Sequence, residues 1–194
     1  MNQNSSSEDT DRAAWPTAVG LICMIYGFFS VVINVWGALR PWMKGPLARM
    51  TETPPPQLPF DLMMLVILGG VFGALLALLL MFGGFKLMQR KVYGVTTLKF
   101  WVVFKFLEVS IGVGISYALL DNMVAHQIKM QDYEILILTE NGGDAETYPK
   151  TTPESMREIA WSGALVSAPL TLIWPLVVGL ILTRRNLAKE VMSW

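Results

Sequence analysis

Charge, cysteine and histidine are all scarce in this sequence, and each shortage excludes a class of protein. Charged residues make up 15% of the 194 residues, against about 25% in an average soluble domain. Basic and acidic residues number 15 each, so the formal net charge is zero. A nucleic-acid-binding protein would need a basic excess. The single cysteine, Cys23, excludes an internal disulfide, a cysteine-based zinc cluster and a dithiol redox pair.

The sequence patterns of common enzyme classes are also missing. His126 is the only histidine, which excludes the HExxH pattern of metal hydrolases. We find no P-loop, no dinucleotide-binding fingerprint and no GxSxG nucleophile motif. We therefore expect no catalysis, no bound metal and no cofactor.

Apolar residues are abundant, at 53% of the chain, and they gather in long runs. Three runs contain no charged residue and exceed the ~20 residues needed to cross a bilayer; they cover residues 13–39, 62–85 and 159–183. A fourth run, 97–120, is interrupted by charges, so it cannot face lipid on all sides. The predicted fold is all-α, an antiparallel bundle of four transmembrane helices.

The domain organisation follows from these spans. Residues 1–12 carry three acidic residues against one arginine, unlike the basic start of a signal peptide. We expect 1–12 to be a disordered tail and 13–194 to form the membrane domain, with an outer loop at 121–158.

The basic residues predict the orientation, because lysine and arginine are enriched in cytoplasmic loops. Eight of them flank the spans on the side that holds both termini, and six lie on the other side. Both termini are therefore expected to be cytoplasmic. Without a signal peptide or paired cysteines, the chain fits a bacterial inner membrane.

The outer loop, 121–158, carries eight acidic residues and three basic ones, a net charge of −5. Such a loop either docks a basic partner or simply remains soluble. Residues 133–138 suit a short strand or a buried turn of helix, and residues 141–144 suit a turn. Thr152 followed by Pro153 is typical of a helix start, so the last helix should begin outside the membrane.

Lys105 and Glu108 form the candidate site, because charged residues inside a span are costly and therefore informative. At a spacing of three they share one helix face, which Gly112 and Ser116 continue. The pair is either a packing device that orients this helix or a binding site for a proton or cation.

Counting about twelve residues from the span ends predicts what surrounds Glu108. The count reaches Gly27, Gly73 and Thr171 in the other three spans. Small residues on two neighbours would let Glu108 point inward, and Thr171 would donate a hydrogen bond to it. Gly69 and Gly73 also form a GxxxG pattern, which predicts a helix-packing face.

Two functions remain open from the sequence. The first is a non-catalytic subunit, assembly factor or anchor that acts through helix packing, with the bilayer and either a protein partner or a second copy of the chain as its contacts. The alternative is a small oligomeric transporter or channel that uses Lys105 and Glu108. The first is favoured because no second acidic residue lies within the spans, and a proton or ion relay normally needs several such groups.

Overall fold

A computed structural model describes residues 14–42, 54–144, 148 and 150–184. Of these residues 87% are helical and none lies in a strand. The helices are α1 (Trp15–Leu39), α2 (Phe60–Met88), α3 (Val92–Ala118), α4 (Leu120–Glu140) and α5 (Pro153–Thr183), with a short 3-10 turn, η1 (Arg40–Trp42), after α1. The predicted tail, 1–12, lies outside the described residues.

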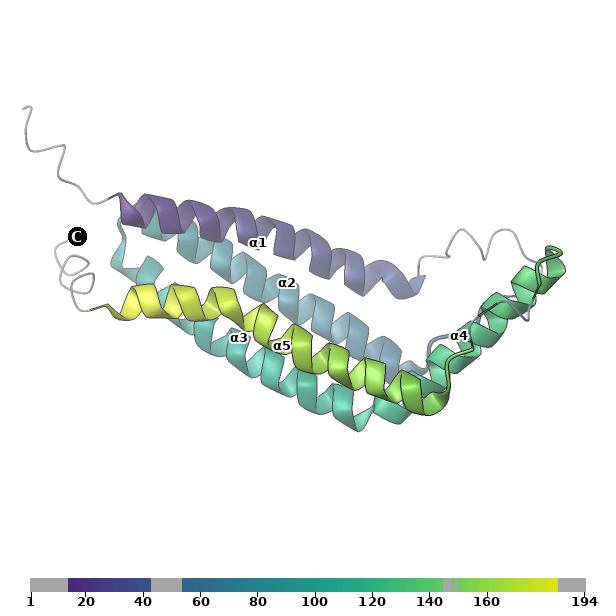
Figure 1. The fold of residues 1–194 in the computed structure, drawn as a ribbon. Helices are drawn as coiled ribbons and strands as arrows, with labels where there is room; N and C mark the ends of the chain where they lie inside the picture. Colours follow the sequence, from purple (N-terminus) through teal and green to yellow (C-terminus); the bar gives the residue numbers. More distant parts are fainter. Residues whose placement is uncertain (1–13, 43–53, 145–147, 149, 185–194) are drawn as a thin grey trace, which may run out of the picture.

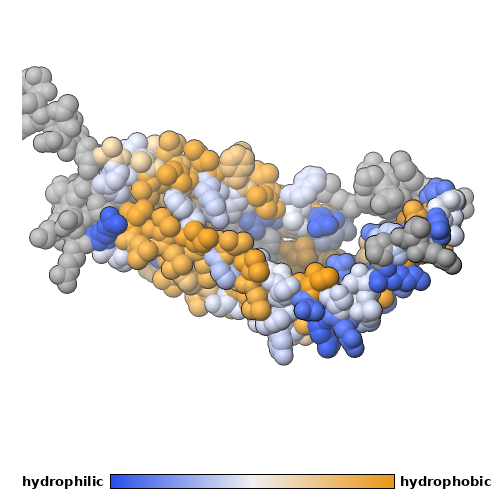
Figure 2. All heavy atoms as spheres, viewed as in Figure 1, coloured by the Kyte–Doolittle hydropathy of each residue, from blue (hydrophilic) through white to orange (hydrophobic). Residues whose placement is uncertain are grey.

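Three helices are long and apolar enough to cross a membrane: α1 extended by η1, α2 and α5. The helix α3 meets the same criterion only together with α4, from which it is separated by a 67° bend. The structure thus contains three to four candidate spans. Hydrophobic side chains cover the body of the bundle, while hydrophilic ones gather at its ends and over α4 (Figure 2).

The helices α1, α2, α3 and α5 lie side by side, and α4 leaves the bundle at an angle (Figure 1). Their buried core lies at one end, where α1 begins, α2 ends, α3 begins and α5 ends. Its members with the least exposure include Cys23, Leu80, Leu98, Trp101 and Val178. The beginning of α1 and the end of α5 therefore meet at the same end of the bundle.

A seam of small residues holds α1 against α2. A methyl group on Gly84 would lie 2.7 Å from the carbonyl oxygen of Gly20, and one on Gly70 would lie 2.7 Å from Cβ of Ala38. A methyl group on Gly27 would likewise lie 2.9 Å from the carbonyl oxygen of Ala77. Because lipid chains are as apolar as leucine, such close backbone approach is a main source of attraction between helices in a bilayer.

The predicted outer loop is largely helical. The helix α4 occupies Leu120–Glu140, so residues 133–138 are neither a strand nor an isolated turn but part of a 21-residue helix. Residues 141–142 form the expected turn, with Gly142 at a φ of 78° that glycine adopts without strain. The helix α5 begins at Pro153 as predicted, and the Thr152 hydroxyl accepts a hydrogen bond from the Ser155 amide at 3.3 Å.

Candidate functional site

The ion pair predicted from the sequence is present in the middle of α3. Lys105 Nζ lies 2.5 Å from Glu108 Oε2, and the two side chains are 13% and 19% exposed. Glu108 Oε2 itself is buried, and no directed hydrogen bond to it is formed by the described residues. The contact is therefore ionic in character. Its attraction is strengthened by the low dielectric of an apolar surrounding.

Glu108 points toward the α1–α2 pair and not outward. A methyl group on Gly73 of α2 would lie 3.2 Å from Glu108 Oε1 and would overlap the side-chain amide of Asn34 of α1. Glycine at position 73 thus leaves the space in which the carboxylate and the amide meet. Asn34 is held in place through its amide nitrogen, which donates to the Ser30 carbonyl at 2.7 Å. The side-chain oxygen of Asn34 and Oε1 of Glu108 both border the space beside Gly73. The Glu108 cluster, defined as Asn34, Gly73, Lys105 and Glu108, therefore draws on α1, α2 and α3.

An aromatic pair packs between α1 and α5. The rings of Tyr26 of α1 and Trp174 of α5 have centroids 6.1 Å apart. The indole Nε1 of Trp174 is buried and has no hydrogen-bond partner among the described residues.

Two of the predicted neighbours of Glu108, Thr171 and Gly27, have other contacts in the structure. The Thr171 hydroxyl donates to the Ser167 carbonyl of its own helix at 2.8 Å, so its single proton is not available to Glu108. Gly27 contacts Ala77 and Met81 instead.

The predicted packing glycines divide into two groups. Gly27 and Gly73 lie at contacts between α1 and α2, whereas Gly69 and Gly112 have no atom within 4 Å of an added methyl group. Gly69 and Gly112 thus contact no other helix in the described part of this chain, because a GxxxG spacing does not say which glycine faces the neighbouring helix. Gly70, one residue after Gly69, faces α1. Ser116, on the predicted α3 face, is half-buried.

Asn34, Tyr26 and Trp174 were not identified from the sequence. Asn34 is the one amide side chain within the charge-free run 13–39, so a search for uncharged polar residues in the spans would have found it. The aromatic residues carry no such signal, because tyrosine and tryptophan are common in membrane helices.

The Glu108 cluster lies in a half of the bundle that is loosely packed. All the fully buried residues of α3 fall within Gly94–Trp101, and those of α5 within Pro175–Leu182. Residues 102–118 of α3 and 153–174 of α5 therefore contain no fully buried residue, although single atoms of Glu108 and Trp174 are buried. In Figure 1 these parts of α3 and α5 lie away from α1, while the opposite ends converge.

His126 on α4, outside the apolar spans, offers a test by pH. Burial, and then the charge of Lys129, lower the pKa of His126 below its usual 6.5, and its Nδ1 is buried without a partner among the described residues. The unfolded segment therefore takes up a proton first as the pH falls below about 6.5. We expect α4 to be most stable above that pH and to exchange its amide hydrogens faster at pH 5, after correction for intrinsic rates. In the His126→Gln variant this pH difference should vanish; a difference that persists would contradict the prediction.

Comparison with models of protein families, with curated proteins and with solved structures gives no match for this chain.

Proposed function

We propose that this chain is a four-span membrane protein whose α1, α2, α3 and α5 cross the bilayer, with α4 outside. The mean hydropathy of α4 is the lowest of the five helices, and it carries four of the eight acidic residues of 121–158. We place both termini in the cytoplasm, in a bacterial inner membrane. Lys86, in the last turn of α2, fits a position at the membrane interface. Its ammonium lies 5.3 Å from the ring centroids of Phe82 and Phe85, and lysines near helix ends extend their charge toward water in this way.

Within that membrane we propose a non-catalytic role, as a subunit, assembly factor or anchor that binds another transmembrane helix. The observation that carries this proposal is the unequal packing of the bundle. One end has a complete core, whereas the half that holds Lys105 and Glu108 has no buried residue in either α3 or α5 beyond the core. Lipid chains offer no hydrogen bonds to an ion pair or to the Trp174 indole. A helix with polar side chains would supply them, either from another protein or from a second copy of this chain.

Gly112 provides the test of this role, because it lies one helical turn beyond Glu108 and has open space around it. A photo-crosslinking amino acid at position 112 should therefore attach covalently to the partner in intact membranes. The same amino acid at Gly69, which is equally open but lies on the exposed face of α2, is the control. We expect a discrete product of higher mass from position 112 only. Products of equal yield from both positions, or none from 112, would contradict the proposal.

A second candidate function is a small oligomeric transporter or channel in which Glu108 binds a proton or cation. It is favoured by the meeting of Glu108 Oε1 with the Asn34 side-chain amide beside Gly73, since the Asn34 amide nitrogen is already bonded to Ser30. Two oxygen acceptors that face one space suit a proton or a cation between them. Proton or cation flux into liposomes that the Glu108→Gln variant abolishes, with the fold intact, would select this function over the first.

A further inference from the structure

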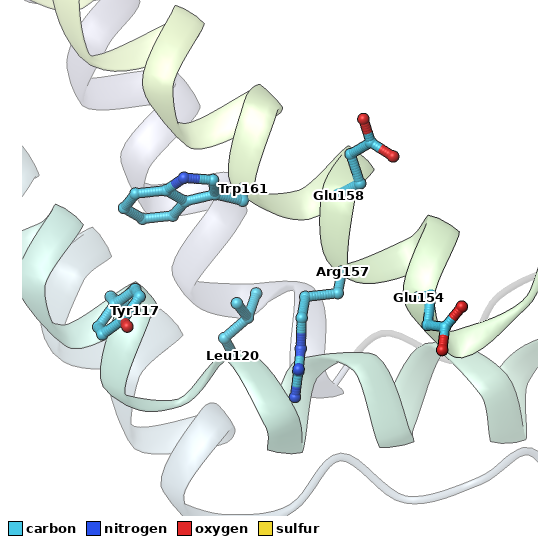
Figure 3. A pocket seen from close by; sticks show the side chains of 6 residues that line it. All are labelled: Tyr117, Leu120, Glu154, Arg157, Glu158 and Trp161. Carbon is cyan, nitrogen blue, oxygen red and sulfur yellow. The ribbon is translucent and has the colours of Figure 1, made fainter.

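A shallow pocket lies far from the Glu108 cluster, where α3 ends, α4 begins and α5 begins. Its volume is about 350 Å³, and it is lined by Tyr117, Leu120, Glu154, Arg157, Glu158 and Trp161 (Figure 3). This volume is near the lower limit of small-molecule sites, which span about 300–1,000 Å³. The pocket therefore has room for a polar headgroup and its nearest carbon atoms.

The apolar wall of the pocket is aromatic. Tyr117 and Trp161 pack edge to face, with ring centroids 5.3 Å apart, and Leu120 lies beside them in Figure 3. Tyrosine and tryptophan are enriched where the bilayer meets water, because one part of each ring system is apolar and another is polar. The charge-free run of α5 begins immediately before Trp161, at Ile159.

The exposed charged residues at the rim of the pocket have an acidic excess. Glu154, Arg157 and Glu158 lie on the first two turns of α5, and Arg157 forms an ion pair with Asp121 of α4. A guanidinium has five N–H donors, so Arg157 retains donors for a phosphate after it has paired with Asp121. Within the part of the chain that the structure describes, neither glutamate forms an ion pair.

We propose that this pocket binds the zwitterionic headgroup of a phosphatidylethanolamine-type lipid. The lipid phosphate accepts hydrogen bonds from Arg157, its ammonium donates to Glu154 and Glu158, and its glycerol region packs against Tyr117 and Trp161. The acidic excess disfavours a lipid of net negative charge, such as phosphatidylglycerol. The inference rests on the proposed placement of α1, α2, α3 and α5 in a bilayer.

Native mass spectrometry of the full-length chain tests this preference. The detergent-solubilised protein is given phosphatidylethanolamine and phosphatidylglycerol of identical acyl chains in equal amounts. We expect the protein to retain about ten times more phosphatidylethanolamine than phosphatidylglycerol. A ratio of this size corresponds to the free energy of roughly one charge-assisted hydrogen bond. The double variant Glu154→Gln, Glu158→Gln should lose this preference. Its thermal midpoint should not change, because both residues are exposed.

The matched control is Asp132→Asn, Glu140→Gln, which removes the same charge from α4 and should keep the preference. Equal or greater retention of phosphatidylglycerol by the unaltered chain would overturn the proposal, as would equal losses in the two double variants. Extraction of native membranes with alkaline carbonate separates this result from the bilayer placement. A chain that stays in the membrane fraction but shows no preference contradicts only the lipid site.

Discussion

Replacing Lys105 by methionine, or Glu108 by leucine, is expected to destabilise the protein strongly, whereas replacing both together should restore most of the loss. Each single change leaves one charge without its partner inside the bundle. A lone charge at the centre of a span costs about 2.5–3.5 kcal/mol on the insertion scale, and the two side chains are only 13% and 19% exposed. The double change removes both charges and leaves two apolar side chains of similar length.

Thermal unfolding in detergent and the amount of chain in the membrane measure this double-mutant cycle. Lys99→Met is the control, because Lys99 is exposed near the start of α3 and should tolerate the change. Losses that simply add in the double variant would show that the two charges do not support each other. A double variant that is stable yet inactive in liposome flux would favour the transport function, since the pair would then be needed for more than packing.

Gly84→Leu is expected to lower the thermal midpoint by several degrees, and Gly69→Leu to leave it unchanged. At position 84 an added Cβ would lie 2.7 Å from the Gly20 carbonyl oxygen and 2.8 Å from Cβ of Cys23. The backbone of α1 cannot yield as a flexible side chain would, so α1 and α2 must separate. Overpacking of this kind costs about 1–3 kcal/mol. For a chain of this size each kcal/mol corresponds to a shift of about 2–4 °C.

The two glycines make a matched pair, because both lie in α2 and both receive the same side chain. Around Gly69 there is open space, so the leucine there faces outward. Equal shifts in the two variants would mean that α1 does not pack on α2 along this seam. A large shift confined to Gly69→Leu would place the packing face on the opposite side of α2.

The sequence predicted the helices well, because long charge-free runs have few structural options. Each of the runs 13–39, 62–85, 97–120 and 159–183 overlaps one observed helix. The start of α5 was also predictable, since Thr152 and Pro153 form a local cap signal that depends on few neighbours. The helix α4 was missed because its polar and apolar residues mix without a clear boundary, and its mean hydropathy is low.

The sequence by itself determined that Lys105 and Glu108 pair, because a spacing of three on one helix brings them together whatever surrounds them. The count from the span ends also placed Gly73 at the depth of Glu108. Only the tertiary structure decided that Asn34 lies beside them and that the Thr171 hydroxyl bonds within α5. It likewise selected Gly70 and Gly84 over Gly69 as contacts of α1. Local spacing fixes contacts within a helix, whereas contacts between helices depend on the rotation and axial offset of each pair. These are set by the packing of side chains from several helices at once.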